Sequence, residues 1–234
     1  MRPLEDMNEL SEYMSSCLFI TIIAMVLGYL SGSISFSILL TRSAGKQDIR
    51  TMGSGNAGFT NMLRSVGKKH AAITFIGDFI KAVIPIVATM LLFKYTTDNS
   101  SYTTIGKYIC GLFCVIGHMF PAYFRLKGGK GVVTSAAVLL MTDYRVFLCV
   151  LTVFLIAFIA TKIVSLGSVL GAFTCFISTL CFAFFSYYKG YSIFYVTSVS
   201  LIATIISALV VIKHRGNIVR IIRGEEKRIT VKKE

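Results

Sequence analysis

The chain has 234 residues, of which 55% are hydrophobic and only 15% are charged, and its mean hydropathy is +0.73. A soluble domain of this length cannot bury so much apolar side chain, so the composition excludes a soluble globular protein and predicts an integral membrane protein. The formal net charge of +13 suggests nucleic acid as a partner, but the basic residues cluster in short segments between apolar runs, which is typical of topology signals.

Apolar runs recur along the chain, each near the roughly 20 residues that a spanning helix needs. They cover residues 17–40, 71–93, 108–124, 146–160, 164–186 and 191–212, and a shorter run covers 131–142. The first run is about twice the length of a signal-peptide core and follows acidic residues, so we predict a retained helix. Gly28 and Gly32 lie on one face of it, a spacing that lets two helices approach closely.

The distribution of lysine and arginine predicts the topology. Basic residues follow the first run, precede 131–142 and follow residue 212, whereas the N-terminus is acidic and residues 96–106 are nearly neutral. The positive-inside rule then puts the N-terminus outside and the C-terminus inside, which needs an odd number of crossings. We therefore predict an all-α polytopic membrane protein of seven transmembrane helices, of which the fourth, 131–142, is short and enclosed by protein. Three glycine-rich segments and the connection 161–165 then share the cytoplasmic face.

No linker divides the chain, so we expect one membrane domain at 17–212, an acidic external extension at 1–16 and a basic cytoplasmic tail at 213–234. All six cysteines lie inside apolar runs, and no disulfide framework or zinc spacing is present. Cys110, Cys114 and His118 share a helix face but lack a fourth ligand, so we interpret the cysteines as core residues. Without paired inward carboxylates we expect no metal, and we expect no cofactor.

The first glycine-rich segment, residues 53–61, has the composition of an anion-binding loop. Gly53, Gly55 and Gly58 free the backbone to turn its N–H groups toward an anion, and the segment also supplies hydroxyl and amide side chains. Arg64 follows one turn later with a planar cation suited to phosphate. A flexible surface turn is the alternative. No Gly-Lys-Ser/Thr follows, so this is not a Walker loop.

The second and third segments are also basic and rich in glycine. Lys127-Gly-Gly-Lys-Gly131 opens the short helix, where helix N–H groups and two ammonium groups can hold a phosphoryl group. The third begins with Lys213-His214-Arg215 and continues into an amphipathic stretch that predicts an interfacial helix. An orientation signal explains the charges of both segments, but it does not explain the interleaved glycines or the histidine.

Four motifs, taken in order, closely resemble those of the acyl-phosphate:glycerol-3-phosphate acyltransferases, the PlsY family. They are residues 53–61 with Arg64, Asp78-x-x-Lys81, residues 117–121 continuing to 127–131, and His214-x-x-Asn217-x-x-Arg220 with residues 224–225. The resemblance covers nearly the whole chain after about residue 20. The acidic extension lies outside it, and Ala82 stands where family members often have glycine.

The resemblance implies acyl transfer from a fatty acyl phosphate to the 1-hydroxyl of glycerol 3-phosphate, which gives lysophosphatidic acid and phosphate in the first acylation of phospholipid biosynthesis. It also implies a multi-pass protein of the bacterial plasma membrane with a cytoplasmic site. Its partners would be glycerol 3-phosphate, acyl phosphate and membrane lipids, without nucleic acid.

The expected site has a catalytic and a substrate-binding set. The catalytic set is Ser54, Arg64, His118, His214 and Asn217. The substrate-binding set is Gly53, Gly55, Asn56, Thr60, Asn61, Lys127, Gly128, Gly129, Lys130, Gly131, Ser165 and Ser168. Glu225 is expected to pair with a basic neighbour, and Asp78 with Lys81 to form a structural ion pair. Because an acyl phosphate is already activated, we expect no covalent enzyme intermediate, with a histidine or a substrate phosphate as the base.

Two other functions fit parts of the pattern. A transporter of an organic phosphate accounts for the helices and the cations, although carriers usually place charges near the bilayer midplane. A lipid-binding scaffold accounts for the basic tail but not for the glycine motifs. The His-x4-Asp signature of acyl-CoA-dependent glycerolipid acyltransferases is absent, because Phe75, Tyr123 and Val219 occupy the fifth positions after the three histidines.

Overall fold

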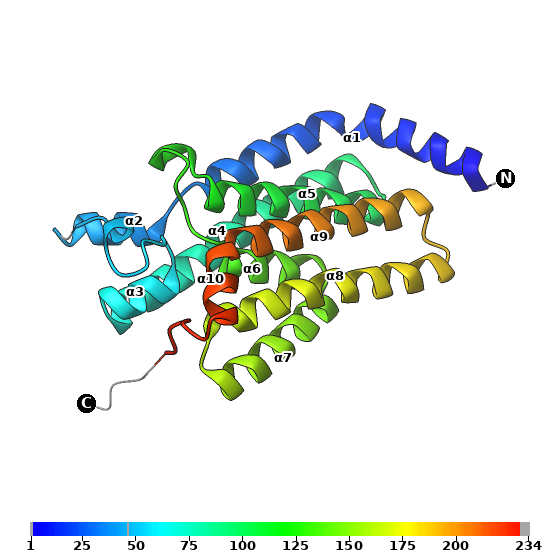
Figure 1. Cartoon of the computed structure of the whole chain (residues 1–234). Helices are drawn as coiled ribbons and strands as arrows, with labels where there is room; N and C mark the ends of the chain where they lie inside the picture. Colours follow the sequence, from blue (N-terminus) through cyan, green and yellow to red (C-terminus); the bar gives the residue numbers. More distant parts are fainter. Residues whose placement is uncertain (1, 46, 230–234) are drawn as a thin grey trace.

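The computed structural model describes residues 2–45 and 47–229 and is all-helical in this part (Figure 1). Lys46 of the basic first loop, and residues 1 and 230–234 of the two terminal segments, lie outside the described residues. The long helices are α1 (Arg2–Gly32), α4 (Lys68–Thr96), α5 (Ser100–Met119), α7 (Tyr144–Thr161), α8 (Val164–Tyr188) and α9 (Ile193–Lys213). The shorter ones are α2 (Phe36–Ser43), α3 (Phe59–Ser65), α6 (Val132–Thr142) and α10 (Arg215–Ile222), with 3-10 turns at Ile49–Thr51 and Ala122–Phe124.

Each of the seven predicted apolar runs contains an α-helix. Six segments of the described chain are long and apolar enough to cross a membrane, and α6, with 11 residues, is the short one. It packs against α4, α5 and α7, and a side chain at Gly111 of α5 would collide with Val138 of α6. The prediction that the fourth helix is short and enclosed by protein is confirmed.

The first apolar run differs from the prediction of one continuous helix, which is wrong at residues 33–35. Helix α1 ends at Gly32, and α2 begins only at Phe36. Neighbouring elements use the polar groups freed by the break: the Ser33 hydroxyl accepts from the Ala122 N–H at 3.1 Å, and the Ile34 carbonyl accepts from Lys81 Nζ at 2.7 Å. At the other end, α1 continues without a break through the described part of the acidic extension.

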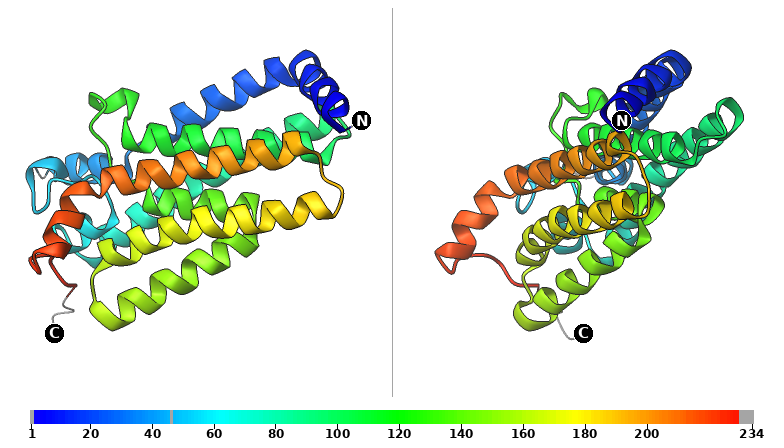
Figure 2. Two further views of the ribbon diagram at one scale, coloured as in Figure 1. Left: turned by 45° about the vertical axis from the view of Figure 1, so that its right-hand side comes forward. Right: turned by 90° about the vertical axis from the view of Figure 1, so that its right-hand side faces the viewer.

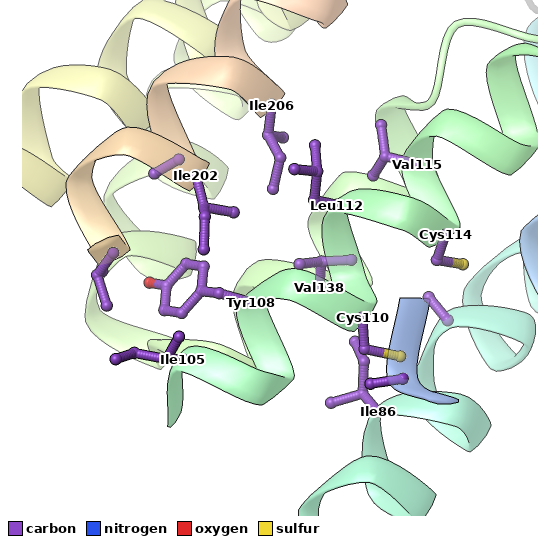
Figure 3. Close-up of a cluster of buried hydrophobic side chains, with 14 of the residues drawn as sticks. Ile86, Ile105, Tyr108, Cys110, Leu112, Cys114, Val115, Val138, Ile202 and Ile206 are labelled. Carbon is purple, nitrogen blue, oxygen red and sulfur yellow. The ribbon is translucent and has the colours of Figure 1, made fainter. Parts of the chain in front are cut away.

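The close approach predicted from Gly28 and Gly32 is confirmed. Any side chain at Gly28 would overlap the Cys110 carbonyl oxygen of α5, and one at Gly32 would overlap the Cys114 backbone. These glycines therefore bring the α1 and α5 backbones together. On the other faces of α5, Tyr108 and Leu112 meet Ile202 and Ile206 of α9, and Cys110 lies beside Ile86 of α4 (Figure 3).

The connections that carry the glycine-rich motifs gather at one end of the bundle. Figure 1 shows α2, α3 and α10 at the end where the C-terminus lies, with the beginning of α1 at the opposite end, and the turned views agree (Figure 2). An odd number of crossings produces this arrangement. At the α1 end, Tyr13 packs against Tyr102 and Phe194, with ring centroids 5.2 and 5.5 Å away.

Candidate active site

The first loop, of which residues 44–45 and 47–58 are described, is folded around one buried amide. Asn61, at the start of α3, is 1% exposed; its Nδ2 donates to the carbonyls of Ile49 and Met52, and its Oδ1 accepts from the Ser54 N–H at 2.9 Å. Gly53 adopts φ +55°, and a side chain there would strike Asn61 Oδ1. Asn61 therefore shapes the loop with all of its bonds directed inward. A separate core supports the loop and comprises Ile38, Ile49, Ala57, Met62, Ala71 and Phe124.

This folding leaves the polar tip of the first loop accessible. Ser54 and Gly55 are exposed, Asn56 and Thr60 are partly buried, and Arg64 is exposed on α3. Arg64 Nη2 donates to the Lys227 carbonyl at 2.8 Å, which joins α3 to residues 223–229, here called the tail segment. A guanidinium has five N–H donors, so Arg64 retains donors for a phosphate.

Asp48 and Arg50 fix the two glycine loops to each other, a role that the sequence reading missed. Asp48 accepts from Arg50 Nε at 3.0 Å and from its Nη2 at 2.8 Å, which lowers the pKa of Asp48 to about 2. Arg50 Nη1 then donates to the Phe124 carbonyl at 2.8 Å and the Lys127 carbonyl at 3.3 Å in the second loop (residues 120–131). The signal available in the sequence was the Asp-x-Arg spacing just before the glycine motif.

The second loop is wrapped tightly onto His118, near the end of α5. The Gly129 N–H donates to the His118 carbonyl at 3.1 Å. A side chain at Gly128 would overlap that carbonyl, and one at Gly129 would overlap His118 Nε2 and the Ala57 carbonyl of the first loop. The glycines are thus needed for contact between the two loops and the imidazole. Gly131, at φ +78°, is the N-cap residue of α6.

Lys130 leads into a network that reaches the third motif. Its ammonium donates to Asn217 Oδ1 on α10, and Asn217 Nδ2 donates to Glu226 Oε1 at 2.6 Å. Glu226 also accepts from Ser165 Oγ at 2.8 Å and from Arg220 Nε at 2.7 Å. The expectation that Glu225 makes the ion pair is therefore corrected: Glu226 pairs with Arg220, because the chain turns inward one residue later, while Glu225 is exposed.

Burial and neighbouring charges shift the pKa values of residues in this network. Burial, with smaller contributions from Arg220 and Arg64, lowers the pKa of Lys130 to about 8 although Glu226 opposes the shift. Burial also raises the pKa of Glu226, but its bonds from Ser165, Asn217 and Arg220 outweigh this and the net pKa is lowered. A phosphate beside Lys130 would stabilise the charged ammonium, which burial disfavours.

His214 lies between α9 and α10 and is 2% exposed. Its Nδ1 lies 2.8 Å from the Val210 carbonyl, which can only accept, so Nδ1 carries the proton and Nε2 has a free lone pair. Burial and the nearby Lys130 lower the pKa of His214 to about 4, so the imidazole is neutral at pH 7.

The structure thus joins some of the expected site residues through two sets of contacts. The first and second loops meet at Gly129 and His118, and the second loop meets α10 and α8 through Lys130 and Glu226. Ser168 is not in direct contact with this network; its hydroxyl donates to the Val164 carbonyl of its own helix. Among the described residues, no group of three or more His, Cys, Asp or Glu side chains could hold a metal ion.

Known proteins match this chain over nearly its whole length. The family model of glycerol-3-phosphate acyltransferase matches residues 22–224. A glycerol-3-phosphate acyltransferase of Finegoldia magna is 40% identical over 89% of this chain and 96% of its own length, and one of Clostridioides difficile is 35% identical over 93% and 99%.

The fold also matches a solved structure. The crystal structure of PlsY (YgiH), an integral membrane glycerol 3-phosphate acyltransferase, in its glycerol 3-phosphate form shares 34% identity and a TM-score of 0.73, and covers 90% of this chain and 96% of the other. Its lysophosphatidic acid form gives a TM-score of 0.71 at 33% identity. The all-helical, multi-pass integral membrane architecture expected from the composition is confirmed. The chain belongs to the glycerol-3-phosphate acyltransferase family, which the motifs had indicated over the transporter alternative.

Proposed function

We propose that the protein transfers the acyl group of a fatty acyl phosphate to the 1-hydroxyl of glycerol 3-phosphate, releasing lysophosphatidic acid and phosphate. The observation that carries the proposal is that two glycine loops with separate cations, Arg64 and Lys130, are held against each other by Arg50 and Gly129. The reaction joins two phosphorylated substrates, so it needs two anion sites side by side. The crystal structures of the PlsY relative are of its glycerol 3-phosphate form and its lysophosphatidic acid form.

The first loop fits the glycerol 3-phosphate. Ser54 offers a hydroxyl at its exposed tip, and Arg64, on α3 just after the loop, offers a guanidinium. Gly53, Gly55, Asn56 and Thr60 belong to the same glycine-rich segment, while Asn61 acts by shaping the loop. Arg64 suits the phosphate because a planar fork can bind two of its oxygens.

The second loop fits the acyl phosphate. Lys127 and Lys130 supply the charge, and Gly128, Gly129 and Gly131 allow the backbone to come close at the N-terminus of α6. Ser165 reaches this site through Glu226, and Ser168 lies one turn further along α8. Because leaving phosphate gains negative charge as the acyl bond breaks, a buried ammonium stabilises the transition state more than the bound substrate.

The transfer needs no covalent intermediate. The 1-hydroxyl attacks the acyl carbon, the carbon–oxygen bond to phosphate breaks, and the hydroxyl proton passes to a base. His214 offers its Nε2 lone pair, but with a pKa of about 4 it is a weak base and orients the hydroxyl as a hydrogen-bond acceptor. A phosphate dianion, with a pKa of about 6, is the stronger base and is already bound beside the hydroxyl.

The proposed orientation puts this end of the bundle in the cytoplasm. Most of the lysines and arginines, 17 of 24, fall in residues 42–69, 125–130 and 213–233. The described parts of these segments lie at one end of the bundle, whereas α1, with its acidic residues, begins at the opposite end (Figure 1). The positive-inside rule therefore favours a cytoplasmic site in the plasma membrane and an external N-terminus.

The test is release of lysophosphatidate and phosphate by the purified protein in detergent, with glycerol 3-phosphate and palmitoyl phosphate as substrates and palmitoyl-CoA as the competing donor. We expect turnover with the acyl phosphate alone, lost in Ser54→Ala and Arg64→Ala. Ser15→Ala and Arg145→Ala, at the other end of the bundle, are matched controls that should remain active. Turnover with palmitoyl-CoA, or with neither donor, contradicts the proposal.

A further inference from the structure

Two charged residues of α4 lie buried directly below the glycine loops. Asp78 and Lys81 are 2% and 4% exposed, and Lys81 Nζ lies 2.8 Å from Asp78 Oδ1, which confirms the predicted ion pair. The pair also reaches His118 of α5: its Nδ1 is 2.9 Å from Lys81 Nζ and 3.7 Å from Asp78 Oδ1. A buried ion pair adds little stability over apolar residues of the same size. Stability therefore does not explain why the pair is present, and its contact with His118 suggests another role.

The contacts of Lys81 determine which nitrogen of His118 carries the proton. An ammonium group has three N–H donors and no acceptor. Lys81 Nζ forms an ion pair with Asp78 Oδ1, donates to the Ile34 carbonyl 2.7 Å away and lies within hydrogen-bond distance of His118 Nδ1. Nδ1 must therefore present its lone pair to the ammonium. A neutral imidazole whose Nδ1 accepts carries its proton on Nε2.

Several further bonds keep Lys81 in this position. The break in the first apolar run frees the Ile34 carbonyl to accept from Lys81 Nζ, and Ser31 Oγ donates to the Lys81 carbonyl at 2.7 Å. Cys114 Sγ lies 3.7 Å from the same carbonyl. Helices α1 and α5 thus both hold the residue, so the direction of its ammonium is fixed by the fold and not by a flexible side chain.

The Nε2 atom of His118 faces the junction of the two glycine loops. A side chain at Gly129 would strike both this atom and the Ala57 carbonyl of the first loop. The N–H therefore lies between the loop that fits the acyl phosphate and the loop that fits glycerol 3-phosphate. Oxygens that gain negative charge during acyl transfer are stabilised by such a pre-oriented donor in a site that excludes water.

We propose that Asp78 and Lys81 are positioning residues that hold His118 as a neutral Nε2–H donor, so that His118 donates a hydrogen bond to a substrate oxygen at the loop junction instead of removing a proton. This inference rests on the proposed function for the identity of the oxygen. The tautomer itself follows from the contacts of Lys81 alone.

The first test measures the tautomer directly. Protein labelled with 15N and 13C in its three histidines is studied by NMR in detergent at pH 7, and His118→Gln assigns the signal. We expect a neutral His118 with the proton on Nε2. In Asp78→Leu/Lys81→Met, which removes both charges and so leaves no unpaired ion, we expect that preference to be lost. A proton on Nδ1, an imidazolium, or an unchanged signal in the double variant overturns the proposal.

The second test separates positioning from stability by turnover. We expect the double variant to fold and to lose about 10- to 100-fold in kcat with little change in the KM values, because one oriented donor is lost from the transition state. Lys107→Met is the matched control, since this lysine donates to the Met141 carbonyl outside the site. If the pair is only structural, the double variant keeps the kcat of the wild type.

A conservative replacement provides a third comparison. Glutamine can present an N–H near the position of Nε2, and asparagine cannot reach it, so His118→Gln should retain about tenfold more activity than His118→Asn. Equal losses contradict a donor role. If the wild-type protein shows no turnover with acyl phosphate, the proposed function fails, but the NMR result still decides whether Asp78 and Lys81 set the tautomer.

Discussion

Lys130 and Asn217 are 87 residues apart in the sequence, and the lysine ammonium donates directly to the asparagine Oδ1. This contact joins the second loop to α10, and through Asn217 Nδ2 it continues to Glu226 and Ser165. The second and third motifs thus form one polar network in which the cation that fits a phosphate is held by a neutral oxygen. Asn217 fixes the direction of the ammonium without neutralising its charge, so the charge stays available to a substrate.

The pKa of Lys130 predicts the alkaline limb of the pH profile. Because burial lowers this pKa to about 8, the free enzyme loses the ammonium as the pH rises through 8, and kcat/KM for the acyl phosphate should fall there. Lys130→Arg keeps its charge, so its kcat/KM should show no such limb up to about pH 10. The measurement is kcat/KM from pH 6 to 10, with Lys107→Arg as the control that keeps the limb at 8. An identical limb in Lys130→Arg would assign it to another group.

The Asp48–Arg50 pair should control both substrates together. Arg50→Lys cannot maintain the fork between Asp48 and the carbonyls of Phe124 and Lys127, so the two loops lose their fixed separation. We expect kcat/KM to fall about 10- to 100-fold for each substrate, since small displacements of reacting groups are costly. Arg42→Lys is the control, because Arg42 is an exposed partner of the same Asp48. A loss confined to one substrate would show that Arg50 serves one loop only.

Gly129→Ala tests the contact between the loops and His118. The added methyl group would overlap His118 Nε2 and the Ala57 carbonyl, so the second loop must move away from both. We expect at least about a 100-fold loss of kcat at nearly unchanged helical content by circular dichroism. Gly216→Ala on α10 is the control, since a methyl group there meets only Arg220 Nη1, at 3.6 Å. Full activity of Gly129→Ala would disprove the close packing.

The sequence predicted the helices better than it predicted the contacts between side chains. Length and hydropathy identify spanning segments because lipid requires backbone bonds to be satisfied within each helix. The positions of the basic loops required an odd number of crossings, and this correctly predicted that α6 is a helix separate from α7. The break at residues 33–35 could not be predicted, because it depends on Lys81 and on Ala122, which lie about 50 and 90 residues away.

Side-chain partners were missed for the same reason. Nothing near Asn61 in the sequence distinguishes an amide that shapes its own loop from one that faces a substrate; its burial and its bonds to Ile49 and Met52 do. Likewise, Glu225 and Glu226 are adjacent and chemically identical. Only the turn at Gly224, with φ +71°, decides which of them faces inward.

That pair of glutamates provides the last prediction. Glu226→Gln removes the charge that binds Ser165, Asn217 and Arg220, so the tail segment should detach, with a loss of about 1–3 kcal/mol of stability. Because the folded pKa of Glu226 lies below its ordinary 4.5, this stability is present above pH 4.5 and is lost as the pH falls through the lower folded value. Thermal melts should therefore separate Glu226→Gln from wild type at pH 7 and converge in acid, while trypsin should cleave the variant's tail segment faster. Glu225→Gln, on the exposed neighbour, should match wild type at every pH, and equal destabilisation by both variants would refute the assignment.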